Sequence, residues 1–164
     1  MSYIFNPFTR KLDDIGNKTM VRGQCSKVTD GAITIATQSV YVTTGLTATL
    51  DTTTANGMTL GTTDAFGLKN DSGATKLFRV YGSIDATDGN NSTLGIKLAK
   101  NGVAIDASEC RAFTGSSAEE AKLVTSWMVE LADGDEISLF IANHRNNDDL
   151  VLKRGRVIAS EVFA

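Results

Sequence analysis

The sequence predicts an all-β protein built as an antiparallel β-sandwich. Five Asx-Gly pairs, which readily adopt the positive φ angles of tight hairpin turns, are spread along the chain. Apolar and polar residues alternate between these turns, and one short segment alone favours a helix. Many short strands with regular turns and almost no helix favour a sandwich or a jelly roll. The pairs are Asp30-Gly31, Asn56-Gly57, Asp88-Gly89, Asn101-Gly102 and Asp133-Gly134.

Strands are expected between these turns. The segments 32–36 and 40–44 are rich in β-branched residues and threonine, which suit strands. Further along, apolar residues recur at every second position, which places one face of each strand on a core. These positions are Phe78, Val80, Gly82 and Ile84, then Leu123, Thr125, Trp127, Val129 and Leu131, and then Ile137, Leu139 and Ile141. The other face of each strand is expected to be partly solvated. The segment 117–122 is the one candidate for a helical turn.

Length and charge limit the possible functions. A chain of 164 residues is most naturally one domain, and such a domain buries roughly 70% of its unfolded surface. The net charge of −3 provides no global positive field, so neither nucleic acid nor an anionic membrane is an expected partner. The first residues do not predict a signal peptide, and no apolar run reaches the length of a membrane helix.

The N-terminal segment differs from the rest of the chain. Residues 1–19 are predicted to be an extended docking arm, and residues 20–164 the sandwich domain. The arm lacks clean strand or helix periodicity, and Pro7 is incompatible with a central strand. Its large apolar residues either fold back on the domain or, as we prefer, bind a partner. The predicted partner-binding residues are Tyr3, Ile4, Phe5, Pro7, Phe8, Leu12 and Ile15.

No catalytic residue and no cofactor is predicted. His144 is the one histidine and lies in a polar run, 144–149, that favours a solvated loop. We therefore expect His144→Ala to change stability by no more than about 0.5 kcal/mol. Cys25 and Cys110 are far apart in the sequence and are predicted to be free, buried or half-buried thiols.

Three polar segments were considered as ligand sites. The tetrapeptide at 153–156 is basic and could contact an anion, although Gly155 within a strand pattern favours a bulge or kink. Two oxygen-rich loops could bind calcium, but their spacing does not match an EF-hand, and turn formation is the favoured interpretation. Their residues are Asp85, Asp88, Asn90 and Asn91, and Asn146, Asn147, Asp148 and Asp149. No metal site is predicted.

From about Val40 onward the chain resembles the C1q/TNF-type jelly roll found in bacteriophage virion proteins. The residues that carry this resemblance are the segments 77–83, 94–102, 129–139 and 157–159. The third segment contains the turn Leu131-Ala132-Asp133-Gly134-Asp135, which is similar to a turn between two late strands of that fold. The opening Ile4-Phe5-Asn6-Pro7-Phe8 also resembles short N-terminal segments of phage head and tail accessory proteins.

The resemblance implies a non-enzymatic virion protein, made in the host cytoplasm. The expected function is that of a capsid cement or decoration protein that binds the major capsid protein as a homotrimer and stabilises the shell. A tail-fibre or tail-adaptor component with a receptor- or glycan-binding jelly roll is the alternative, and a C1q-like lectin outside phages is a third option. The predicted loops carry few aromatic residues, which favours the capsid. A trimer would also bury aromatic side chains in excess of what one sandwich holds, namely some of Phe78, Tyr81, Trp127 and Phe140.

Overall fold

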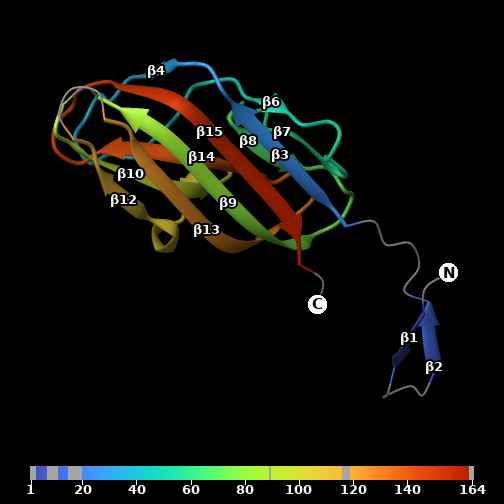
Figure 1. The fold of residues 1–164 in the computed structure, drawn as a ribbon. Coiled ribbons are helices and arrows are strands. Elements are labelled where there is room, and N and C mark those ends of the chain that lie inside the picture. The colour runs from blue at the N-terminus through green and yellow to red at the C-terminus, as the bar shows by residue number, and fades with distance from the viewer. Residues whose placement is uncertain (1–2, 7–10, 15–19, 89, 116–118, 163–164) are drawn as a thin grey trace.

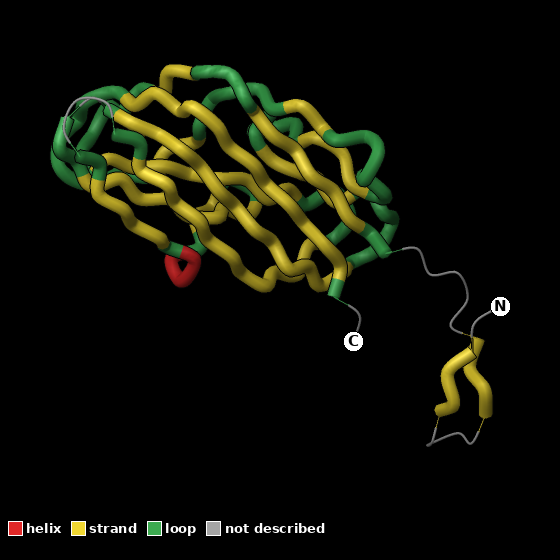
Figure 2. The backbone as a smooth tube through the Cα atoms, viewed as in Figure 1, coloured by secondary structure: helices red, strands yellow, loops and turns green. Residues whose placement is uncertain are grey.

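The computed structural model describes residues 3–6, 11–14, 20–88, 90–115 and 119–162 of the 164-residue chain. Within these residues the elements are β-strands, apart from one 3₁₀ turn, η1 (Asp106–Ser108). The strands form two packed layers (Figures 1 and 2). The prediction of an all-β sandwich is confirmed. In the described part of the chain, no helix is long and apolar enough to span a membrane.

The first layer is a six-stranded antiparallel sheet. Its strands follow the order β13-β9-β15-β3-β6, and β4 pairs with the first residues of β15. Figure 1 looks onto the side of this sheet that faces away from the second layer. The strands are β13 (Ala121–Leu131), β9 (Lys76–Thr87), β15 (Leu150–Glu161), β3 (Arg22–Lys27), β6 (Thr49–Leu50) and β4 (Gly31–Ile33).

The second layer is a seven-stranded antiparallel sheet. Its order is β11-β10-β14-β8-β7, with β12 paired to β10 and β5 paired to β14. The strands are β11 (Val103–Ala104), β10 (Thr93–Lys100), β14 (Glu136–Asn143), β8 (Gly67–Asn70), β7 (Met58–Leu60), β12 (Cys110–Phe113) and β5 (Val42–Thr43). The early segments predicted as strands, 32–36 and 40–44, contain only the short strands β4 and β5.

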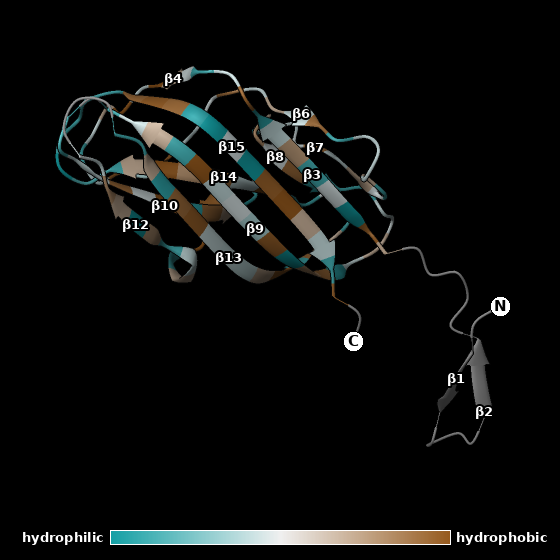
Figure 3. Cartoon of the chain, in the orientation of Figure 1, coloured by the Kyte–Doolittle hydropathy of each residue, from teal (hydrophilic) through white to brown (hydrophobic). Residues whose placement is uncertain are grey.

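The core lies between the two sheets and is built by alternation. Along β9, Phe78, Val80, Gly82 and Ile84 are buried, and the residues that alternate with them are exposed or half-buried, as the sequence predicts. Figure 3 shows hydrophobic and hydrophilic residues alternating along the strands of this sheet. A Cβ at Gly82 would lie 2.5 Å from Cδ2 of Leu139 on the other sheet, so glycine allows the layers to pack closely here.

The Asx-Gly turns are confirmed in part. Asn101 and Gly102 have φ of 50° and 77° and join β10 to β11, which is the positive-φ pair that a tight hairpin requires. Gly57 and Gly134 also adopt positive φ. Gly31 instead lies within β4, and Gly89 lies outside the described residues.

The helical turn predicted at 117–122 is wrong where the structure describes it. Ala121 and Lys122 are the first residues of β13, because they continue its pairing with β9. Residues 116–118 lie outside the described part. The helical turn that the domain does have, η1, was not predicted.

The N-terminal segment contains a two-stranded antiparallel sheet, β1 (Tyr3–Asn6) and β2 (Lys11–Asp14). Its register pairs Tyr3 with Asp14 and Asn6 with Lys11. The expectation of an arm without regular strands is therefore wrong for these residues. Pro7 lies outside the described residues.

Candidate interaction surface

Along β14, the outer side of the seven-stranded sheet is covered by the chain itself. Every residue of β14 is buried, including those that point away from the core. We call these outward residues the covered face; they are Glu136, Ser138, Phe140 and Ala142. The expectation that each strand leaves one face partly solvated is wrong for β14.

Glu136 shows how the covered face is held. Its carboxylate accepts hydrogen bonds from the backbone N–H of Thr62 (2.7 Å) and Thr63 (3.0 Å) and from the Thr62 hydroxyl (2.5 Å). Burial alone would raise the pKa of Glu136, but these donors outweigh it and the pKa lies below its ordinary value. The ionised carboxylate thus fixes the loop after β7 against β14.

A second polar cluster lies on the outer side of the same sheet. The Tyr41 hydroxyl donates to Oε1 of Glu109 (2.5 Å), and Arg111 donates to the same oxygen (2.8 Å). Nε2 of His144 lies 3.2 Å from the Tyr41 hydroxyl. A Cβ at Gly95 would lie 2.4 Å from that hydroxyl and 2.6 Å from Nε2, so β10 carries glycine where the two side chains meet. The cluster joins segments that are distant in the sequence.

His144 was predicted to be solvated, and this is wrong. The residue does follow β14 in a loop, but its side chain is only 10% exposed because Tyr41 and Gly95 contact the ring. Desolvation, together with the nearby Arg111 and Lys97, lowers the pKa of His144, while Glu109 opposes the shift. The pKa of Tyr41 is raised by burial and by Glu109, so the phenol stays protonated at neutral pH.

The two oxygen-rich loops come together at one end of the sandwich. Asn90 donates to Asp148 (2.9 Å), and Asn143 donates to Asp88 (3.1 Å). Both carboxylates thus hold the loops to each other, which supports the turn interpretation. Asp85 belongs to β9 rather than to its predicted loop. Among the described residues, no group of three or more His, Cys, Asp or Glu is placed to hold a metal ion.

Both cysteines are free thiols, as predicted. Cys25 is buried in the core, where its Sγ donates to the Gly67 carbonyl at 3.6 Å. Burial raises the pKa of the Cys25 thiol to about 12. Cys110 on β12 is half-buried.

The outer side of the six-stranded sheet is different, because large side chains on it are open to solvent. We call the outward residues of β9, β13 and β15 the open face. On β9, Leu77 and Tyr81 are 37% and 39% exposed, and on β13 Met128 is 49% exposed. Arg79 lies between them, with its guanidinium carbon 5.3 Å from the centre of the Tyr81 ring.

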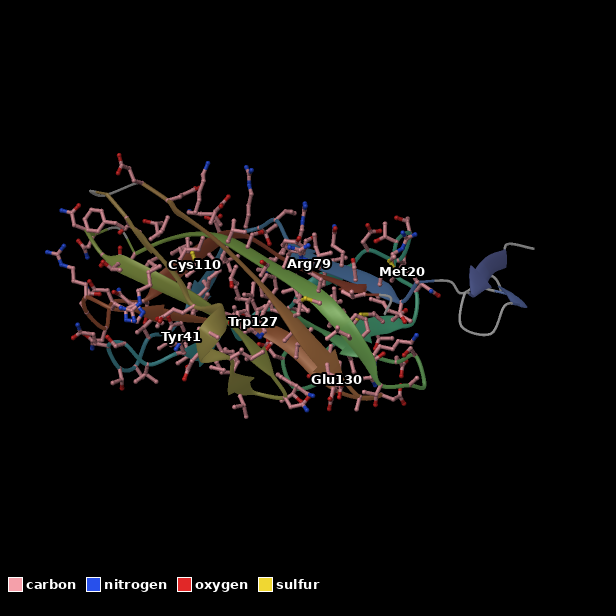
Figure 4. All side chains as sticks on the ribbon, turned by 90° about the horizontal axis from the view of Figure 1, so that it is seen from below. Met20, Tyr41, Arg79, Cys110, Trp127 and Glu130 are labelled. Atoms are coloured by element: carbon pink, nitrogen blue, oxygen red, sulfur yellow. The ribbon has the colours of Figure 1, made fainter. Side chains whose placement is uncertain are left out.

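Trp127 adds to this surface from the edge of the sheet. The alternation of β13 places Trp127 opposite Val80, on the core side, as predicted. It is nevertheless 41% exposed, because β13 is an edge strand and the core ends there. Together with Arg79, Ser126 and Met128, Trp127 lines a shallow hollow. Figure 4 labels Arg79 and Trp127 on their strands. We call Leu77, Tyr81, Trp127 and Met128 the apolar band.

The predicted excess of aromatic residues is seen for two of the four. Phe78 and Phe140 are buried, whereas Tyr81 and Trp127 are partly exposed. Sequence reasoning named Tyr81 and Trp127 among the surplus aromatic residues but did not select Leu77 or Met128. The signal was present, since large apolar residues occupy positions of β9 and β13 that alternate with the core positions.

The predicted partner-binding residues of the arm are only partly described. Tyr3, Ile4 and Phe5 lie on β1, and Leu12 lies on β2, where it pairs with Phe5. The other predicted residues, Pro7, Phe8 and Ile15, lie outside the described residues.

Comparisons with known proteins identify the fold. No protein-family model and no curated protein matches the chain. A crystal structure of murine APRIL at pH 5.0 aligns with a TM-score of 0.53 at 11% identity, over 86% of this chain and 99% of that chain. A second murine APRIL structure, at pH 8.5, gives a TM-score of 0.50 at 10% identity over the same shares. The protein is therefore an all-β, TNF-like jelly-roll sandwich, and at these identities the likeness shows the fold alone.

Proposed function

We propose that this chain is a non-enzymatic structural protein of a bacteriophage virion, a capsid decoration protein that assembles as a homotrimer. In this proposal the apolar band joins the copies, and residues 1–19 attach the trimer to the major capsid protein. The phage setting is supported by the sequence resemblance described above. The self-association is supported by the partial exposure of the apolar band.

The observation that carries the proposal is the partial exposure of the apolar band to solvent. Fully burying an exposed Leu, Met or aromatic side chain is worth roughly 1.5–3 kcal/mol. Leu77, Tyr81 and Met128 are partly exposed on the outer side of β9 and β13, and Trp127 is partly exposed at the rim of the same sheet, in contrast to the buried outer side of β14. Contiguous exposed apolar residues of this kind usually mark an interaction surface.

The edge position of β13 also favours the binding of a partner next to the apolar band. β13 has 11 residues and forms one rim of its sheet, so among the described strands it has a hydrogen-bonded neighbour on one side only. Long edge strands with apolar residues are prone to association unless they are covered. Closed cyclic symmetry would cover this edge and the apolar band in every copy. The choice of three copies rests on the C1q/TNF-type resemblance.

Sedimentation equilibrium tests the self-association. A homotrimer at micromolar concentration is expected for the full chain. Met128→Glu should dissociate it without unfolding the domain, because the new charge would lose its hydration in the interface. Phe113→Glu is the matched control, because Phe113 is exposed on β12, in the other sheet. A wild-type protein that sediments only as a monomer would contradict the proposal.

A binding experiment tests the attachment. Removing residues 1–16 should leave a folded trimer that no longer binds decoration-free capsids in a pull-down, with circular dichroism as the check on folding. Phe5→Ala combined with Phe8→Ala should weaken binding sharply, whereas Phe113→Ala should not. Binding of the truncated trimer at full strength would show that the arm is not the attachment device.

A further inference from the structure

A β-bulge in β15 places two arginines on the same side of the six-stranded sheet. The register with β9 shifts between Leu152 and Arg154, so Lys153 is an extra residue in the strand. Leu152 and Val157 are both buried in the core. Without the extra residue, Arg154 would share the core side with Leu152. The bulge turns Arg154 and Arg156 outward instead.

Gly155, between these arginines, faces the core at a point of close contact. A Cβ there would lie 2.4 Å from Cζ of Phe66, so the strand can pass over this ring only with glycine. The sequence-based expectation of a bulge near Gly155 is confirmed, although the register shift lies between Leu152 and Arg154 rather than at Gly155 itself. The bulge and the glycine together decide which way the basic side chains of 153–156 point.

Hydroxyl groups flank the arginines on both neighbouring strands. Arg156 pairs in register with Ser26 on β3 and with Ser83 on β9. These residues and Arg154 line one hollow of about 190 Å³, together with Lys27 and Asp85. Asp85 is the one carboxylate in its lining, so the hollow carries an excess of positive charge.

Within the described residues, the basic side chains of this hollow lack the contacts that most other lysines and arginines of the domain make. From residue 20 onward, the described lysines and arginines elsewhere contact a carboxylate, a carbonyl or an aromatic ring, apart from Lys122. Lys122 and Arg154 are both opposite Asp85 in the sheet, without an ion pair to it in the part of the chain that the structure describes. Lys153, next to the bulge, is bound to Asp30 at 2.6 Å. No such partner lies within contact distance of Arg154, Arg156 or Lys27 in the described structure. Arg154, Arg156 and Lys27, which lack such a partner among the described residues, therefore lie in one hollow, although the chain as a whole has a negative net charge.

We propose that this hollow binds an oxyanion group, with Arg154 and Arg156 as the charged donors and the hydroxyls of Ser26 and Ser83 as neutral donors. A guanidinium presents paired N–H groups that match the oxygens of a carboxylate, phosphate or sulfate. The nearby Asp85 weakens the field and disfavours anions that approach from its side. The inference does not depend on the trimer or on the capsid.

Calorimetric titration of the full-length protein tests the proposal, at low ionic strength because screening weakens exposed charge pairs. The probes are inorganic phosphate, sulfate and a hexaglutamate peptide, with a hexaglutamine peptide as the neutral control. Arg154→Gln with Arg156→Gln should weaken binding by about tenfold or more, as expected for lost charge-assisted hydrogen bonds. Arg22→Gln removes an equal charge from the same sheet, at the start of β3 and outside the hollow, and should leave affinity unchanged. Asp85→Asn should strengthen binding.

The probes also distinguish the source of the oxyanion. Tighter binding of hexaglutamate than of phosphate assigns the hollow to an acidic protein segment, and the reverse order assigns it to phosphate or sulfate groups. The inference is overturned if none of the three probes binds, or if the double variant binds as well as the wild type. Sedimentation of the same samples records the oligomeric state, so failure of the proposed trimer is seen separately.

Discussion

The outward residues of β14 and those of β9 and β13 come from similar alternating strands but have opposite relations to solvent. On the seven-stranded sheet, Glu136 and Phe140 point outward and are buried, because the chain returns over β14. On the six-stranded sheet, Tyr81 and Met128 point outward and remain open. A self-covered face serves stability, whereas an open face with large apolar residues is available for a partner. The following predictions test this contrast, from the largest expected effect to the smallest.

The first prediction compares two glutamates. Glu136→Ala should destabilise the domain by about 3 kcal/mol, because buried N–H groups of Thr62 and Thr63 would lose a charged acceptor. Glu130→Ala, at an exposed position of β13, should change stability by less than about 0.5 kcal/mol. Urea unfolding of both variants measures the difference. Equal effects would show that the covered face does not depend on this carboxylate.

The second prediction concerns His144, on the outer side of the seven-stranded sheet, and the dependence of stability on pH. The folded-state pKa of His144 is lowered, chiefly by desolvation, so the unfolded chain binds the proton more readily. Stability from this residue is complete above the unfolded value of about 6.5 and is lost as the pH falls below it. Urea midpoints from pH 7.5 to 5 should therefore fall more for the wild type than for His144→Gln. Parallel curves would contradict the burial of this ring.

His144→Ala is now expected to cost more than the sequence alone indicated. The substitution removes the contact with Tyr41 and leaves a gap beside Gly95, at a cost of about 1 kcal/mol. Thermal or urea unfolding at pH 7.5 checks this value. A change below about 0.5 kcal/mol would restore the interpretation of a solvated loop.

The smallest expected effect concerns the thiols. Cys110 should react with iodoacetamide in the folded protein, whereas Cys25 should not, since burial raises its pKa to about 12 and removes it from solvent. Mass spectrometry after limited labelling counts the modified sites. Labelling of Cys25 at the rate of Cys110 would show that the core between the sheets opens readily.

Local patterns predicted the core strands well. In β9 and β13 the core positions follow from a period of two, which depends only on neighbours in the sequence. The covered face could not be predicted in this way, since Thr62 lies 74 residues from Glu136 and Tyr41 lies 103 residues from His144. Alternation gives only the side of a strand and places Trp127 on the core side, whereas its partial exposure follows from the edge position of β13, which depends on strand order. The bulge was anticipated from Gly155, but which side chains it turns outward depended on the register with β9.

Trp127 provides the most direct test that the apolar band joins copies of the chain. It is the one tryptophan in the sequence, so fluorescence emission reports on the apolar band alone. We predict that emission shifts to longer wavelength as the protein is diluted and the trimer dissociates, with Met128→Glu at the long-wavelength limit at every concentration. Phe113→Glu should follow the wild-type curve. Emission that stays constant while sedimentation shows the trimer dissociating would place the interface elsewhere and contradict the account.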